Sequence, residues 1–215
     1  GTTARRLVVR SVRQLTGGTD GCRLALLPRW LRWQHERFVH SSESSSSTCR
    51  GRGSVQKTPY VNGKEHGMEI WYSKDGSTFM ETPFVDGHRH GMVFQYREDG
   101  SKCMETPWVD GKRMGVEITY YEDGSKFSET PYVDGKKHGT DIRYYENGNK
   151  KEEKPFLEGI RHGTSIYYYE DGSKKRELTS LNGRTHGTAV DYQEDGSRAM
   201  ETLYENGKEI SRKEF

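Results

Sequence analysis

The chain has 215 residues, a formal net charge of +2, only 30% hydrophobic residues, and a mean hydropathy of −1.03. A compact two-layer globule of this length would need a larger apolar share, so the composition argues against an ordinary hydrophobic core. The sequence has no run of about 18 apolar residues, and we therefore predict no membrane-spanning helix.

The first part of the chain, residues 1–56, is a basic leader. It contains ten Arg against three acidic residues, a net charge of +7, and it ends in the run "SSESSSST". An Arg-rich, Ser-rich, acid-poor and amphipathic segment is typical of organellar transit sequences, although a disordered basic tail fits the composition equally well. We predict short helices in this N-terminal extension and an organellar location, mitochondrial before plastid.

Aromatic and arginine side chains are interleaved in the second half of the leader. Such residues carry much of the binding energy at protein interfaces, so we predict that they contact other protein subunits of a large assembly. An amphipathic segment of this kind also fits a membrane surface, which remains the alternative. The candidate contact residues are Arg29, Trp30, Arg32, Trp33, Arg37 and Phe38.

Residues 57–215 form an array with a period of 24 residues and no insertion or deletion. Its 24 basic and 29 acidic residues give a net charge of −5, which disfavours nucleic-acid binding. Three glycine columns follow the period. The column that we assign to tight turns contains Gly63, Gly87, Gly111, Gly135, Gly159 and Gly183.

The local chemistry of the array predicts β-hairpins. Asn-Gly and Asp-Gly dipeptides favour tight turns, and alternating segments such as 68–72 lie between them. We therefore predict an all-β fold, an elongated single-layer antiparallel meander of hairpin repeats with about a dozen strands. A single layer is stabilised by backbone ladders and cross-strand pairs, so it needs few apolar residues.

Two-residue turns would fix the register of each hairpin. We expect Ile70 opposite Glu81, Tyr72 opposite Phe79, and Glu81 opposite Met92. One face then carries the isoleucine, tyrosine and valine columns. The other face is mostly polar and carries a lysine row, comprising Lys102, Lys126, Lys150 and Lys174. A bulge near the repeated His-Gly pair would change part of this, above all for the aromatic column Phe84, Trp108, Tyr132 and Phe156.

The repeated polar columns look structural. Equivalent histidines lie two strands apart, roughly 9–10 Å, which is too far for neighbours to share a metal ion. Each repeated glutamate faces an apolar residue, and we expect it to accept a hydrogen bond from a tyrosine hydroxyl or a backbone amide. We predict no catalytic residue, no metal site and no cofactor. Among the array residues, the aromatic side chains of Trp108 and Tyr132 are the candidates for partner binding.

The repeat unit resembles the variant form of the MORN repeat (membrane occupation and recognition nexus). The elements that carry the resemblance are "DGKKHG" at 134–139, "YY" at 144–145 and "ENG" at 146–148, repeated in six units over about residues 58–210. Departures are few and comprise Met114, Ile160 and Ser180.

Membership of this family implies an elongated antiparallel β array with a role in protein association and scaffolding. Lipid binding is proposed for some members, and bacterial relatives are often labelled as antitoxin components. The resemblance supplies no catalytic residue. We therefore predict a non-catalytic scaffold subunit of a larger complex, with a phospholipid-associated module or an antitoxin-like protein as alternatives.

Overall fold

The computed structural model describes residues 55–215. The predictions made for the leader, including its short helices and its Trp and Arg contact residues, lie outside the described residues. Within 55–215 every regular element is a β-strand, so no helix there is long and apolar enough to cross a membrane. The all-β prediction for the array is confirmed.

The strands repeat in a set of three. A six-residue strand comes first in each unit: β4 (Gly67–Tyr72), β7 (Gly91–Tyr96), β10 (Gly115–Tyr120), β13 (Gly139–Tyr144), β16 (Gly163–Tyr168) and β19 (Gly187–Tyr192). An eight-residue strand follows: β5 (Thr78–Val85), β8 (Lys102–Val109), β11 (Lys126–Val133), β14 (Lys150–Leu157), β17 (Lys174–Leu181) and β20 (Arg198–Glu205). A two-residue strand then pairs back: β6 (His88–Arg89), β9 (Lys112–Arg113), β12 (Lys136–Lys137), β15 (Ile160–Arg161) and β18 (Arg184–Thr185).

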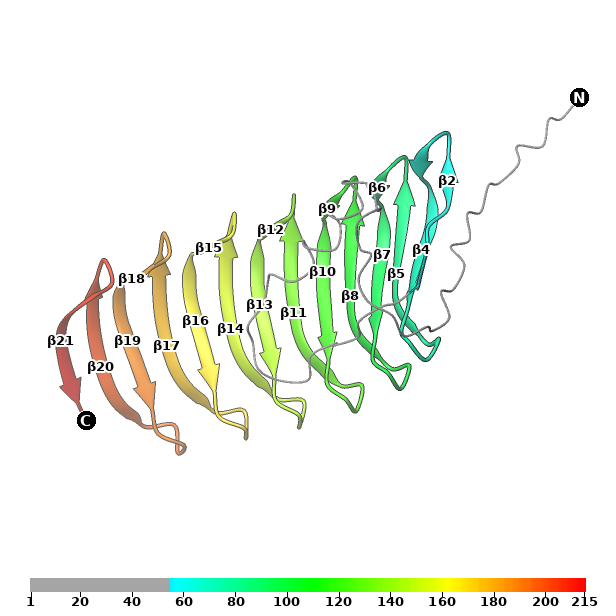
Figure 1. The fold of residues 1–215 in the computed structure, drawn as a ribbon. Helices are drawn as coiled ribbons and strands as arrows, with labels where there is room; N and C mark the ends of the chain where they lie inside the picture. The colour runs from blue at the N-terminus through cyan, green and yellow to red at the C-terminus, as the bar shows by residue number, and fades with distance from the viewer. Residues whose placement is uncertain (1–54) are drawn as a thin grey trace, which may run out of the picture. The chain divides into compact units, whose positions relative to one another are not determined.

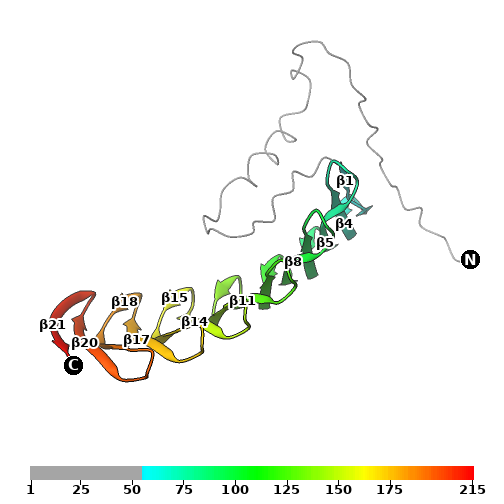
Figure 2. The same ribbon diagram turned by 90° about the horizontal axis from the view of Figure 1, so that it is seen from below.

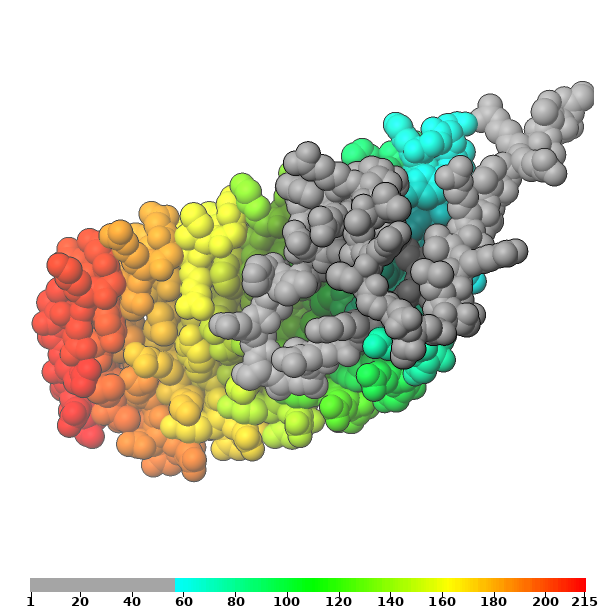
Figure 3. All heavy atoms as spheres, viewed as in Figure 1, coloured from blue at the N-terminus to red at the C-terminus, as the bar shows by residue number. Residues whose placement is uncertain are grey.

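These strands form one long open antiparallel sheet in which neighbours in the chain are neighbours in space (Figure 1). By backbone pairing, the order is β1, β4, β5, β7, β8, β10, β11, β13, β14, β16, β17, β19, β20, β21. The outer strands are β1 (Val55–Lys57) and β21 (Lys208–Glu214), while β2 (Tyr60–Val61) and β3 (Lys64–Glu65) pair separately. In the space-filling view, the strands from β14 to β21 follow one another in chain order as an unbroken surface (Figure 3).

The tight turns lie along one long edge of the sheet. Asp134 and Gly135 both have positive φ, 51° and 80°, between β11 and β12. Two successive positive φ angles define a type I′ turn, whose twist matches that of the strands it joins. Val133 pairs with Lys136 across this turn, as the two-residue turn requires. This edge is the upper one in Figure 1.

The Asp-Gly turns of the opposite edge differ from the expected form. At Asp75-Gly76 only the glycine has positive φ, 89°. The Gly76 amide donates to the Ser73 carbonyl at 3.0 Å, and the Ser73 amide donates to the Ser77 carbonyl at 2.8 Å. The connection is therefore a three-residue loop that ends in a glycine, not a two-residue turn. Figure 2 views the sheet from below, the side on which these loops lie in Figure 1.

Two bulges correct the predicted register. Ile70 pairs with Glu81 as expected, but Tyr72 pairs with Thr78 instead of Phe79, because the longer loop leaves Phe79 as an extra residue. Glu81 pairs with Phe94 instead of Met92, since the strand bulges around the repeated His-Gly pair. The second shift spans two residues and preserves the alternation of side chains.

The two faces of the sheet are named here after the residues that recur on them. The tyrosine face carries Tyr96 and its equivalents, together with the isoleucine and glutamate columns. The threonine face carries Thr82 and its equivalents, together with the aromatic column. The lysine row was predicted on the wrong face: Lys102 pairs with Tyr96 and lies over the Phe94 ring, so it shares the tyrosine face.

The most deeply buried side chains lie on the threonine face. Thr82 and Ala189 are fully buried, and Thr202 is 1% exposed. The isoleucine and valine columns nevertheless lie on the tyrosine face, as the sequence predicted. In residues 55–215 the sheet is a single layer, so this burial indicates that the bulged strands bend toward the threonine face and crowd its small side chains.

Candidate partner-binding face

The tyrosine face is built from the same contacts in each unit. Its central row alternates apolar and glutamate side chains across twelve strands: Ile70, Glu81, Phe94, Glu105, Ile118, Glu129, Ile142, Glu153, Ile166, Glu177, Val190 and Glu201. The Tyr96 hydroxyl donates to Glu81 at 3.0 Å, and the Tyr168 hydroxyl donates to Glu153 at 3.0 Å. The prediction that the glutamates accept from tyrosines is confirmed.

A basic residue at the start of the same strand as each glutamate completes this ladder. Lys174 lies 2.6 Å from Glu177, and Lys150 contacts Glu153 in the same way one unit earlier. Partial burial, followed by the hydrogen bond to Glu105, raises the pKa of Tyr120 from 10.0 to about 12. The hydrogen bond from Lys174 lowers the pKa of Glu177, although partial burial opposes the shift. The ladder therefore favours neutral tyrosine and ionised glutamate together.

The threonine face behaves differently, because one of its rows changes from unit to unit. A row that crosses the whole sheet, here called the variable row, repeats no residue type regularly. In order across the strands it comprises Trp71, Met80, Gln95, Met104, Thr119, Ser128, Arg143, Glu152, Tyr167, Arg176, Asp191 and Met200.

This contrast separates two kinds of position. A residue that recurs at one position in six structurally equivalent units meets a requirement of the fold. A position that takes Trp, Gln, Thr, Arg, Tyr and Asp in successive units is not fixed by the fold. Side chains at such positions are available for recognition, and they occupy one face of one sheet.

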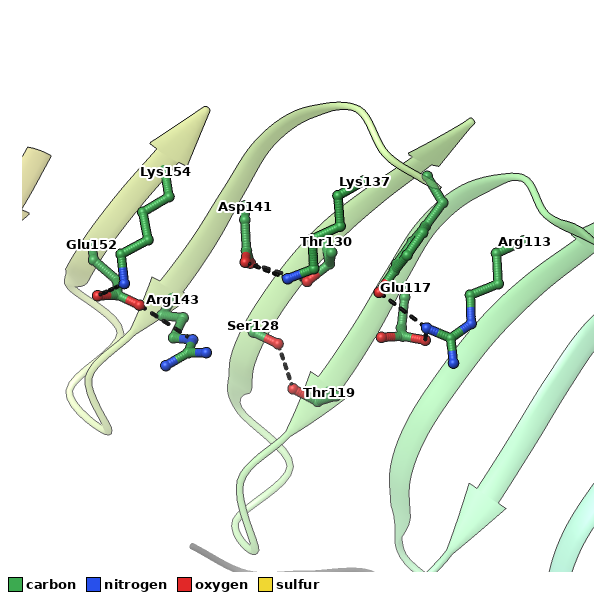
Figure 4. A network of polar contacts seen from close by, with 11 residues as sticks. Arg113, Glu117, Thr119, Ser128, Thr130, Lys137, Asp141, Arg143, Glu152 and Lys154 are labelled. Atoms are coloured by element: carbon green, nitrogen blue, oxygen red, sulfur yellow. Dashed lines mark hydrogen bonds and ion pairs between the residues drawn. The ribbon is translucent and has the colours of Figure 1, made fainter. Parts of the chain in front are cut away.

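Polar contacts organise the centre of the threonine face (Figure 4). The Thr130 hydroxyl donates to Asp141 at 3.0 Å, and Lys137 lies 2.8 Å from the same carboxylate. Because Asp141 is buried, both contacts offset the cost of removing its charge from water. The unit before repeats the arrangement, with Thr106 at 3.0 Å and Arg113 at 3.4 Å from Glu117.

The aromatic column lies at the edge of this face, where cations stack on its rings. Arg113 lies 5.0 Å from the Tyr132 ring centre and 5.7 Å from that of Trp108, and its guanidinium donates to the Tyr132 hydroxyl at 3.0 Å. Arg89 covers Trp108 at 5.0 Å. The two predicted array contacts, Trp108 and Tyr132, therefore share one aromatic–cation ladder, in which Tyr132 is only 9% exposed.

The repeated histidines contact acids of the next turn along the sheet. His90 Nδ1 is 3.2 Å from Asp110, and His138 Nδ1 is 3.3 Å from Glu158. Residues 55–215 contain no group of three or more His, Cys, Asp or Glu side chains that could hold a metal ion. These pairs join successive units in the first part of the array. Met114 replaces one histidine, and Asn182 and Asn206 replace the acids that would face His162 and His186.

The sequence matches the MORN repeat variant in three consecutive segments, residues 115–134, 137–158 and 161–182. Residues 115–182 thus contain three MORN repeats of the variant type. Each matched segment contains one six-residue strand and the eight-residue strand that follows and pairs with it. No curated protein sequence matches the chain. MORN repeats are typically non-catalytic modules.

The unit that repeats in this chain includes the turns and the tyrosine-face ladder but not the variable row. The predicted contact residues of the leader, including Trp30 and Trp33, lie outside the described residues. Sequence reasoning missed the variable row, although a signal was present. Aligning the units column by column would have separated the columns that recur from those that change.

Proposed function

We propose that this MORN repeat protein is a non-catalytic scaffold subunit that holds protein partners on its threonine face within a larger organellar complex. The observation that carries the proposal is the division between a repeated tyrosine face and a threonine face that varies from unit to unit. Trp108 and the arginines Arg113, Arg143 and Arg176, residue types that are enriched at protein interfaces, lie on the varying side.

The leader supplies the second half of the proposal. Its transit-like composition supports import into an organelle, mitochondrial before plastid, and its Trp–Arg cluster supports a second anchor on the complex. A phospholipid surface is the alternative occupant for this amphipathic segment.

Affinity purification of the tagged full-length chain from organelles, followed by mass spectrometry, tests the scaffold function. The threonine-face variant combines Gln95→Arg and Thr119→Arg. Its matched control combines Thr140→Arg and Thr188→Arg at exposed positions of the tyrosine face, so both variants gain the same charge.

The first variant should lose its protein partners, and the control should keep them. If only the control variant lost its protein partners, the interface would lie on the tyrosine face. Recovery of phospholipid without protein would contradict the scaffold function.

A further inference from the structure

Four basic side chains gather on one part of the threonine face, between β13 and β17. This basic patch consists of Arg143, Lys154, Arg161 and Arg176. Arg143 and Arg176 belong to the variable row, and Lys154 pairs with Asp141 in the neighbouring row. Figure 4 shows Arg143, Glu152 and Lys154 together, on the same side as Lys137 and Asp141.

The acids nearby do not balance these bases. Glu152 is shared, at 3.3 Å from Arg143 and 2.6 Å from Lys154. The Arg176 Nε lies 3.4 Å from Asp191, within ion-pair distance but without a hydrogen bond. One carboxylate between two cations leaves a surplus of positive charge on this part of the face.

Arg161 adds to the surplus because the repeat pattern breaks around it. In the two preceding units the equivalent cation has an acid four residues later, as Arg113 has Glu117 and Lys137 has Asp141, and lies over the aromatic ring of the next unit. For Arg161 the residue four positions later is Ser165, and Ser180 replaces the next ring. Within the described residues Arg161 forms no ion pair, and it is exposed.

The rest of the array has the opposite charge. The array as a whole has a net charge of −5, and the loops of the lower edge in Figure 1 carry exposed acidic residues in five successive units. They comprise Glu98, Asp99, Glu122, Asp123, Glu146, Glu170, Asp171, Glu194 and Asp195. A long polyanion such as a nucleic acid would meet these acids, whereas a short acidic segment would not.

We propose that the basic patch binds an extended acidic segment of a protein partner through carboxylate side chains. The patch spans three strand spacings from β13 to β17, roughly 14 Å at 4.7–4.9 Å each. An extended chain rises roughly 3.3 Å per residue, so two carboxylates about four residues apart reach Arg143 and Arg176 together. Each arginine offers a planar fork of donors that fits a carboxylate in bidentate geometry.

This inference rests on the proposed scaffold function and specifies the chemistry of the partner segment that the scaffold binds. It is tested by fluorescence anisotropy of the purified full-length protein with a fluorescein-labelled oligoglutamate peptide at low salt. The patch variant combines Arg143→Ala, Arg161→Ala and Arg176→Ala. The control combines Lys126→Ala, Lys150→Ala and Lys174→Ala, which removes the same charge from the tyrosine face.

The wild type and the control should bind oligoglutamate, and the patch variant should bind at least about tenfold more weakly, since each tenfold step is only about 1.4 kcal/mol. Arg161→Glu is a second variant at an exposed, unpaired position that should not disturb folding, and it should weaken binding in the same direction. Added salt should weaken the wild-type interaction.

Equal loss in the patch variant and the control would overturn the proposal, because net charge alone would then explain binding. Stronger competition by a phosphoserine peptide than by unlabelled oligoglutamate would replace carboxylate by phosphate as the recognised group. If oligoglutamate does not bind but partners still depend on Gln95 and Thr119, the acidic-segment proposal fails while the scaffold function stands.

Discussion

The glycine that follows each repeated histidine should be more sensitive to substitution where a proline faces it. Gly139 has a φ of 105°, and a Cβ placed on it would lie 3.1 Å from Pro131 Cγ. At the equivalent Gly187 the φ is 86°, Thr179 replaces the proline, and no atom lies within 4 Å of the Cβ position. The two sites thus differ mainly in one contact.

Alanine at either site adopts a backbone conformation that L-residues rarely populate, which costs roughly 1–3 kcal/mol. At Gly139 the new methyl also overlaps a rigid proline ring, since carbon atoms pack best at roughly 3.5–4.0 Å. Forcing an extra methyl into such a contact costs roughly 1–3 kcal/mol more. We therefore expect Gly139→Ala to destabilise the array by about 2 kcal/mol more than Gly187→Ala does.

Thermal unfolding followed by circular dichroism measures this difference. For a protein of this size, 1 kcal/mol shifts the midpoint by roughly 2–4 °C, so Gly139→Ala should melt about 4–8 °C below Gly187→Ala. In a Pro131→Ala background, the added cost of Gly139→Ala should fall to that of Gly187→Ala. Equal midpoints for the two single variants would show that the contact with Pro131 contributes nothing.

Three further outcomes are expected. The pKa of Tyr96 and of Tyr120 is raised to about 12, so both should stay neutral at pH 10 in an ultraviolet absorbance titration, and stability should fall as pH rises from 10 to about 12. The pKa of Glu153 and of Glu177 is lowered below 4.5, so the stability that these ionised glutamates contribute is present above pH 4.5 and is lost as the pH falls below it. Changing both residues to Gln should therefore flatten the acid side of the pH–stability curve. Deleting residues 1–56 should preserve the β-rich dichroism spectrum and oligoglutamate binding, because strand contacts are local, but should abolish entry into the complex in cells.

The repeat, the hairpins and the tyrosine–glutamate hydrogen bonds could be predicted because each depends on local sequence. Asn-Gly and Asp-Gly favour tight hairpin connections through backbone sterics, and the pairing of Ile70 with Glu81 follows from strand alternation. These features recur in every unit, so an error in one unit would have been visible against the others.

The bulges could not be predicted in this way, because an extra residue changes the register without changing the composition. Strand alternation alone predicts a two-residue turn at Asp75-Gly76, whereas the structure forms a three-residue loop there. The Asp75 carboxylate accepts hydrogen bonds from the backbone amide and the hydroxyl of Ser77, and the resulting bulge moves the lysine row to the tyrosine face. The Asp-Gly-Ser sequence carried this signal through its serine.

The burial of the threonine face depends on how the bulged strands bend, which no single unit specifies. Its recurring Thr and Ser residues were nevertheless informative, since small side chains at equivalent positions indicate crowding. Thr82, Thr106 and Thr130 are all at most 5% exposed, while Val85 and Val133 on the other face are each 41% exposed. In a single-layer sheet, hydrophobicity is therefore a poor guide to the buried face.

The two faces have different roles, which explains how a weakly hydrophobic chain can present a surface that recognises specific partners. Stability is distributed over backbone ladders and over the tyrosine face, where each ladder contact is small but recurs in unit after unit. The fold therefore does not depend on the identity of the part-exposed residues of the variable row. The row passes from Trp71 at one end to Arg143 and Arg176 further along, so different partners, or different parts of one partner, meet different chemistry along one sheet.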